Sequence, residues 1–200
     1  GERLAEKINS KWPDETIDVV IPVPDTSRTA ALQLANELDL KYREGFIKNR
    51  YIARTFIMPG QKQRKKSVRQ KLSAIQLELK GKSVLLVDDS IVRGTTMQAL
   101  VKNLKEWSGA KEVHLRIGCP PITSPCFYGI DFPTISELYA GKKTPNANDF
   151  RADSLHYLSL AGLLTAVNKN KDNLCTACFT SEYPTQEGID RLNKQIALNT

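Results

Sequence analysis

Two adjacent carboxylates, Asp88 and Asp89, directly follow the apolar run VLLV at residues 84–87. A continuous apolar run of this length is typical of a parallel β-strand buried on both faces, and ligands bind beyond the carboxyl ends of such strands. Paired carboxylates at that point can accept hydrogen bonds from a sugar diol and can help to hold a hard cation. The pair therefore predicts a site for a ligand rich in hydroxyl groups.

The next seven residues, SIVRGTT at 90–96, lead into a predicted amphipathic helix at 97–107. The first N–H groups of a helix have no partner within the helix, and they bind phosphate well. Gly94 permits a positive φ, while Thr95 and Thr96 add hydroxyl donors. Strand, acids and turn together predict a sugar-phosphate pocket. From the two acids and the glycine alone, an ordinary connection between a strand and a helix remains an open alternative.

This segment resembles the phosphoribosyl pyrophosphate (PRPP) loop of type I phosphoribosyltransferases, and VDDSIVRGTT at 87–96 is similar to the form found in the glutamine PRPP amidotransferase family. Other parts of the chain resemble further segments of that family. They are VVIPVPDTS at 19–27 (pyrophosphate loop), KNRY at 48–51 and RTFI at 54–57 (start of the lid), and SPCFYGID at 124–131 with CFT at 178–180 (later signatures). The resemblance extends over residues 16–140 and 153–184. One departure is a turn at 106–109 that is one residue longer than usual.

The resemblance implies a role for each segment. Backbone amides of Asp25, Thr26 and Ser27 are expected to bind pyrophosphate, and Thr26, Asp88 and Asp89 are expected to hold Mg²⁺ directly or through water. Lys48, Arg50 and Arg54 are expected to close over the leaving group, with Asp88, Asp89 and Arg54 as the catalytic residues. The 5-phosphate is expected to bind to Ser90, Ile91, Val92, Arg93, Gly94, Thr95 and Thr96.

The activity implied is the phosphoribosyl-transfer half of the amidotransferase reaction, which forms 5-phosphoribosylamine and pyrophosphate from PRPP and ammonia in purine synthesis. In the family a glutaminase domain precedes this region, and its nucleophile is an amino-terminal cysteine. Because the chain begins with Gly1 and a predicted helix that reaches residue 12, we expect a fragment that receives ammonia from an absent glutaminase domain. Purine nucleotides are expected as feedback inhibitors, and the full-length protein is expected to be a homo-oligomer.

Two other functions are compatible with the same loops: a non-catalytic regulator that senses PRPP or nucleotides, and a nucleobase salvage transferase. A regulator that binds DNA would need a recognition module, and neither terminal segment has a helix-turn-helix pattern. The family signatures around Cys126 and Cys178 argue against the salvage transferase.

The chain has four cysteines, at positions 119, 126, 175 and 178. The C-x₂-C spacing of Cys175 and Cys178 permits a shared metal, but it is also compatible with two reduced structural thiols. The resemblance implies that Cys126, Cys175 and Cys178 are three ligands of a [4Fe–4S] cluster whose fourth ligand lies outside this region. Cys119 is expected to be a buried thiol at the end of a strand.

Part of the net charge of +7 lies in one basic run: Lys62, Arg64, Lys65, Lys66, Arg69 and Lys71. The run could be a solvated surface loop, a nucleic-acid patch, or a mobile lid over an anionic substrate. It has no interleaved aromatic residue for base stacking, so we predict no nucleic-acid partner. Its place between two predicted ligand loops favours a lid at about residues 48–72.

Two hundred residues with 40% hydrophobic content suffice for one α/β domain. Predicted strands at 17–23, 84–87 and 112–118 alternate with predicted helices at 29–38 and 97–107, and a short strand is predicted at 42–47. This order favours a mostly parallel sheet flanked by helices, the type I phosphoribosyltransferase fold. We expect a core at 1–140 and a C-terminal appendage with the cysteine pair at 141–200. The chain lacks an apolar run of membrane-spanning length, so we predict no membrane partner and a cytoplasmic location.

Overall fold

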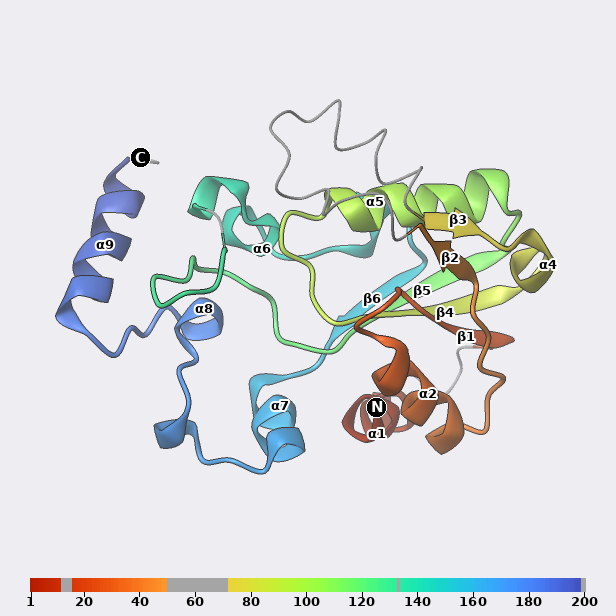
Figure 1. Ribbon diagram of the computed structural model, residues 1–200, viewed down its shortest axis with the longest axis horizontal. Helices are drawn as coiled ribbons and strands as arrows, with labels where there is room; N and C mark the ends of the chain where they lie inside the picture. Colours follow the sequence, from red (N-terminus) through yellow and green to blue (C-terminus); the bar gives the residue numbers. More distant parts are fainter. Residues whose placement is uncertain (12–15, 50–71, 133, 199–200) are drawn as a thin grey trace.

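The computed structural model describes residues 1–11, 16–49, 72–132 and 134–198 (Figure 1). At its centre is a four-stranded parallel sheet in the order β1-β4-β5-β6. The strands are β1 (Val19–Pro22), β4 (Ser83–Asp88), β5 (Glu112–Ile117) and β6 (Ser154–Tyr157). The predicted parallel α/β architecture is therefore confirmed, as are the strands predicted around 17–23, 84–87 and 112–118.

The carboxyl ends of the four strands lie along one edge of the sheet. Pro22 pairs with Val87, Asp88 pairs with Ile117, and Ile117 pairs with Tyr157. Every residue of β4 is buried, which explains why residues 84–87 within it are continuously apolar rather than alternating with polar residues. The loops that follow β1, β4 and β5 consequently leave the sheet at the same edge.

Helices cover both faces of the sheet (Figure 1). On one face α5 (Thr95–Lys102) packs Met97 and Leu100 against Val84 and Leu86 of β4. On the other face, Leu85 and Val87 pack against α1 (Glu2–Lys11) and α2 (Arg28–Glu37), and α7 (Leu160–Val167) lies beside them. The alternating direction of side chains along β4 divides the core in this way.

The helix predicted at 97–107 forms in two parts: α5 and a π-helical segment, Asn103–Trp107. A π-helical turn holds one more residue than an α-helical turn. Such a turn would accommodate an additional residue, although the longer turn at 106–109 stays a prediction; Leu104 of this segment is buried in the core.

A separate antiparallel pair consists of β2 (Phe46–Lys48) and β3 (Leu72–Ala74), with Lys48 opposite Leu72. The strand predicted at 42–47 is displaced, because regular pairing begins at Phe46 and Tyr42 makes an isolated bridge to Val20. The short helix α4 (Gln76–Leu79) then leads into β4. Arg50, Arg54, the basic run and most of the predicted lid lie outside the described residues.

The carboxyl-terminal third contributes β6, which the sequence did not predict, to the edge of the main sheet. The sheet thus continues into the part of the chain that was expected to be an appendage, and the boundary at residue 140 stays a prediction. The remaining elements are 3₁₀ turns at Ile135–Glu137, Ala147–Phe150 and Lys171–Asn173, and helices α6 (Tyr139–Lys142), α8 (Ala177–Thr180) and α9 (Gln186–Ala197). Over the described ranges, no helix has the length and apolar character needed to cross a membrane.

Candidate active site

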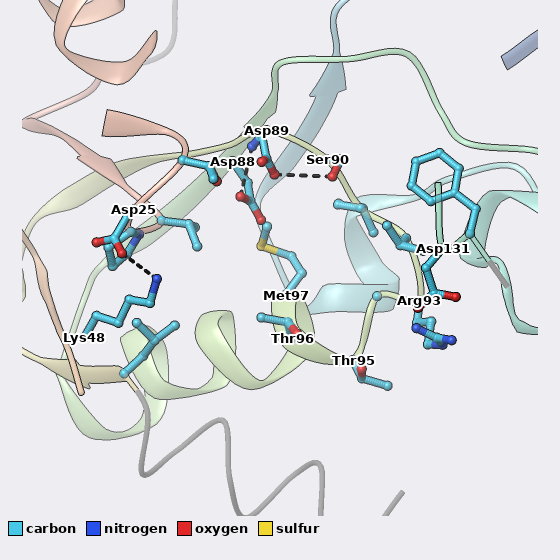
Figure 2. A pocket seen from close by; sticks show the side chains of 18 of the residues that line it. Asp25, Lys48, Asp88, Asp89, Ser90, Arg93, Thr95, Thr96, Met97 and Asp131 are labelled. Atoms are coloured by element: carbon cyan, nitrogen blue, oxygen red, sulfur yellow. Dashed lines mark hydrogen bonds and ion pairs between the residues drawn. The ribbon is translucent and has the colours of Figure 1, made fainter. Parts of the chain in front are cut away.

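A cavity of about 570 Å³ lies at the carboxyl edge of the sheet (Figure 2). Three loops supply most of its wall: the β1 loop (residues 23–27), the β4 loop (residues 89–96) and the β5 loop (residues 118–132). The lining residues are Val23, Pro24, Asp25, Thr26, Lys48, Leu72, Asp88, Asp89, Ser90, Ile91, Val92, Arg93, Gly94, Thr95, Thr96, Met97, Ile130, Asp131 and Phe132. The cavity is where parallel α/β proteins bind ligands, beyond the carboxyl ends of the strands.

Asp88 is the last residue of β4 and is only 9% exposed. Its Oδ1 accepts hydrogen bonds from Ser27 Oγ at 3.1 Å and from the backbone N–H of Asp89 at 2.9 Å. Burial raises the pKa of Asp88 well above its usual range, and the adjacent charge of Asp89 raises it further, while these two hydrogen bonds act in the opposite direction. A cation beside this pair would offset both the burial and the repulsion.

The β4 loop turns sharply at Gly94, which has φ of +79° and caps the amino terminus of α5. A Cβ atom at this position would lie 3.3 Å from Cε1 of Phe150, so both the backbone conformation and the packing favour glycine. Behind the loop, the backbone N–H of Tyr139 donates to the carbonyl of Val92 at 2.8 Å. The segment around residues 139–150 thus supports the loop from outside the cavity.

The β1 loop meets the end of β2 through charged side chains. Lys48 Nζ lies 2.5 Å from Asp25 Oδ2, and Arg28 Nη1 lies 3.3 Å from Asp25 Oδ1. Arg28 also pairs with Glu44, at 3.2 Å from Nε to Oε1. Thr26 is exposed at the cavity wall. This network brings Lys48 next to a loop that precedes it by more than twenty residues.

The far wall contains Ile130, Asp131 and Phe132 of the β5 loop, which the sequence did not predict to be site residues. Figure 2 shows Asp25 and Lys48 on one side of the cavity, Arg93 and Asp131 on the other, and Asp88 and Asp89 between them. The place of this loop after β5 is the signal that could have identified it, because β5 is parallel to β4.

The structure brings together the predicted site residues that it describes. Asp25, Thr26, Lys48, Asp88, Asp89 and all seven residues at 90–96 line the cavity. Ser27 does not line it but is joined to it through Asp88. Arg50 and Arg54 lie outside the described residues, so their placement stays a prediction.

The C-x₂-C segment packs against the β5 loop. The carbonyl of Cys178 accepts hydrogen bonds from the backbone N–H groups of Thr123 at 2.9 Å and Ser124 at 3.1 Å. Burial raises the pKa of Cys178 to about 11, and the charges of Cys126 and Cys175 contribute to this shift. Nevertheless, the described residues contain no group of three His, Cys, Asp or Glu side chains that could hold a metal ion.

Cys119 lies two residues beyond β5, close to the predicted strand end, but it is partly rather than fully buried. Burial raises its pKa to about 12, and its Sγ donates to the carbonyl of Pro120 at 3.2 Å. The thiol is therefore protonated at neutral pH, and we assign it no role in the site.

Comparisons with known proteins agree with this geometry. Residues 1–119 match the family model described as phosphoribosyl transferase domain. The chain is 54% identical over 190 residues to an amidophosphoribosyltransferase of Pseudomonas aeruginosa, an alignment that covers 92% of this chain and 38% of the relative. It is 47% identical over 192 residues to the amidophosphoribosyltransferase of Escherichia coli, with 94% and 38% covered.

A solved structure, glutamine PRPP amidotransferase from B. subtilis complexed with ADP and GMP, has a TM-score of 0.75 and 44% identity to this chain, and the alignment covers 92% of this chain and 42% of that one. This chain thus spans less than two fifths of the length of these two curated relatives. The family model, the parallel sheet and the loops at its carboxyl edge lead to one conclusion: the chain belongs to the phosphoribosyl transferase domain family and has the type I phosphoribosyltransferase fold.

Proposed function

We propose that this protein performs the phosphoribosyl-transfer half of the amidophosphoribosyltransferase reaction, forming 5-phosphoribosylamine and pyrophosphate from PRPP and ammonia in purine synthesis. The observation that carries the proposal is the cavity, in which the β1 loop, the acidic pair and the β4 loop meet. The names and high identity of the curated relatives support it. Those relatives are much longer than this chain. We therefore also propose that the ammonia comes from a glutaminase domain outside these 200 residues.

Each part of PRPP has a proposed partner. The β4 loop and the amino terminus of α5 would bind the 5-phosphate through backbone N–H groups and the hydroxyls of Thr95 and Thr96. Asp88 and Asp89 would accept hydrogen bonds from the two ring hydroxyls. The amides of Asp25 to Ser27 would bind the pyrophosphate, since the β1 loop leads directly into α2.

The donor set of the cavity fits Mg²⁺. Among the lining residues that the structure describes, Asp25, Asp88, Asp89 and Asp131 are acidic, whereas Lys48 and Arg93 are basic. A polyanion such as PRPP needs additional positive charge to bind there. Mg²⁺ is usually held by one or two carboxylates together with substrate phosphates and water, so it does not require three protein ligands. Thr26, Asp88 and Asp89 would hold it, directly or through water.

In the proposed reaction the bond between the anomeric carbon and pyrophosphate breaks, a carbon–nitrogen bond to ammonia forms, and a proton leaves to solvent. Mg²⁺ held by Thr26, Asp88 and Asp89 would supply positive charge for the departing pyrophosphate. The residues of the chain orient the reactants: the acidic pair fixes the sugar ring, and Lys48 lies beside the β1 loop, where negative charge develops. Arg50 and Arg54 are proposed to close over the same leaving group.

We further propose that purine nucleotides inhibit by occupying the same phosphate sites. The B. subtilis relative was solved as a complex with ADP and GMP. A nucleotide 5′-phosphate has the same chemistry as the 5-phosphate of PRPP, so the β4 loop suits both. Competition between PRPP and a purine nucleotide in a binding assay tests this point.

An iron–sulfur cluster on Cys126, Cys175 and Cys178 is proposed as a structural cofactor. What supports it is the C-x₂-C spacing of Cys175 and Cys178, together with the nearness of Cys126 and Cys175 to Cys178 that their effect on its pKa implies. The three thiols do not form a closed ligand group within the described part of the chain, and we derive no catalytic step from a cluster. Iron and acid-labile sulfide analysis of protein purified without oxygen provides the test.

The proposed function is tested by a substrate screen with Mg-PRPP and each of ammonia, adenine, hypoxanthine and uracil, with pyrophosphate release as the readout. We expect release with ammonia alone among the four. Turnover with a nucleobase would instead identify a salvage transferase. Tight Mg-PRPP binding without turnover of any acceptor would favour the non-catalytic sensor.

A further inference from the structure

Ser27 occupies an unusual position at the start of α2. It is the N-cap residue and is only 1% exposed, yet its side chain makes no capping hydrogen bond. Only its carbonyl continues the helix pattern, by accepting the backbone N–H of Ala31 at 2.9 Å. A serine at this position normally uses its hydroxyl oxygen to accept an N–H group of the first turn. The hydroxyl of Ser27 therefore serves another contact.

That contact is with the acidic pair of the cavity. Ser27 Oγ donates to Asp88 Oδ1 at 3.1 Å, across 61 positions of sequence. The backbone N–H of Asp89 donates to the same oxygen at 2.9 Å. Two donors on one oxygen restrict the rotation of the carboxylate and leave the lone pairs of Oδ2 for other partners. Because the site is buried, these two hydrogen bonds are stronger than they would be in water.

We propose that Ser27 is a positioning residue for phosphoribosyl transfer, whose hydroxyl holds the Asp88 carboxylate in the orientation that receives the sugar hydroxyls and the cation. The inference rests on the proposed function. Ser27 is not among the residues that line the cavity, and its hydroxyl would act through Asp88. The backbone amide of Ser27, which we propose for pyrophosphate, is retained in a Ser27→Ala variant. The same hydrogen bond joins the loop proposed for pyrophosphate to the acid proposed for the ring hydroxyls, so these two parts of the site are directly connected.

A double-mutant cycle separates this role from a general effect on folding. The variants are Ser27→Ala, Asp88→Ala and the double variant. Calorimetry measures the dissociation constant of Mg-PRPP for each of them. Ser108→Ala is the matched control, because Ser108 is also buried (3% exposed) and its hydroxyl also donates over 3.1 Å, to Asn103 Oδ1, away from the cavity. Melting temperatures of all variants are recorded alongside.

We expect Ser27→Ala to weaken Mg-PRPP binding about tenfold in the wild-type background, as loss of a hydrogen bond to a charged group would. In the Asp88→Ala background, Ser27→Ala should raise the dissociation constant of Mg-PRPP by less than about twofold, because the acceptor of the hydrogen bond is already absent. Ser108→Ala should lower the melting temperature without a comparable loss of affinity.

Equal losses from Ser27→Ala in both backgrounds, or no loss in the wild-type background, would overturn the positioning role while leaving the proposed function in place. Failure of the unmodified protein to bind Mg-PRPP would instead overturn the proposed function and this inference with it.

Discussion

Lys48 and Asp25 join strand β2 to the β1 loop, with 2.5 Å between Lys48 Nζ and Asp25 Oδ2. Asp25 also pairs with Arg28, so its carboxylate connects two cations at the cavity rim. The lysine that we place beside the leaving group is thus held by an anion of the chain itself. A pyrophosphate group that enters the cavity must share this lysine with Asp25 or replace Asp25 as its partner.

We predict that Lys48→Gln weakens the binding of both Mg-PRPP and purine nucleotides, by about tenfold each, because it removes one charge-assisted contact from shared phosphate sites. Lys82→Gln is the control, since Lys82 has similar side-chain exposure (35% against 27%) but pairs with Glu78 away from the cavity. Competition binding with a labelled nucleotide provides both affinities. Unchanged affinity for both ligands would remove Lys48 from the site.

Asp88→Asn should stabilise the ligand-free protein and weaken its binding of Mg-PRPP. Burial and Asp89 raise the pKa of Asp88 in the folded protein above its unfolded value. Between those two pKa values the folded protein binds more protons than the unfolded chain, so stability falls as pH rises through this range and then levels off. Asparagine does not titrate, and the stability advantage of the variant should therefore grow with pH over the same range.

Thermal unfolding of wild type and Asp88→Asn between about pH 4 and pH 8 measures this effect, with the reference carboxyl pKa near the lower limit. A variant that is less stable than wild type across the whole range would show that the buried carboxylate contributes to folding rather than opposing it.

Gly94→Ala is predicted to lose both stability and ligand affinity. The residue has φ of +79°, and a new Cβ would meet the ring of Phe150 at 3.3 Å. Gly81→Ala is the matched control, with φ of +73° and open space around the added atom. Both variants should lose about 1 kcal/mol of folding free energy through backbone strain. Only Gly94→Ala should weaken Mg-PRPP binding, and equal affinities would mean that the conformation of the β4 loop is unimportant.

Tyr139→Phe should reveal how strongly the segment behind the β4 loop is held. The Tyr139 hydroxyl donates to Asp149 Oδ2 at 2.7 Å and accepts the backbone N–H of Asn146 at 3.0 Å, and the side chain is buried. Its loss should destabilise the protein by about 1–2 kcal/mol, because an N–H group is left without its acceptor. Tyr128→Phe is the control, because it removes an exposed hydroxyl that contacts Thr185 Oγ1 at 2.9 Å. Chemical denaturation should show a smaller loss of unfolding free energy for Tyr128→Phe than for Tyr139→Phe. Equal losses of unfolding free energy from the two variants would show that the Tyr139 hydroxyl does not hold the segment behind the β4 loop.

The central strands could be predicted because burial on both faces leaves a simple apolar pattern, as β4 illustrates. Strand β6 could not be predicted in the same way. All four of its residues are only partly buried, and its SLHY sequence mixes polar and apolar side chains at the edge of the sheet. Pairing with β5 defines this strand, and such tertiary pairing is not visible in a local pattern.

In the site, too, local sequence patterns predicted some residues and missed those that depend on long-range contacts. Local motifs placed the acidic pair and the β4 loop, since their chemistry depends on neighbours in sequence. The hydrogen bond from Ser27 to Asp88 spans 61 positions, and the wall at 130–132 depends on the path of a long loop. A serine that directly precedes a helix usually caps it with its hydroxyl, so the local pattern alone would assign the Ser27 hydroxyl to α2 rather than to Asp88. Long-range contacts of this kind required the structure.

The central claim is that one cavity binds all three parts of PRPP in a defined orientation. The most direct test is a crystal structure of the protein with Mg²⁺ and PRPP or a non-reacting analogue. We predict electron density for the 5-phosphate against residues 90–96, for the ring hydroxyls beside Asp88 and Asp89, and for the pyrophosphate at residues 25–27 near Lys48. Density for the ligand outside this cavity, or with its two phosphate ends reversed, would contradict the account.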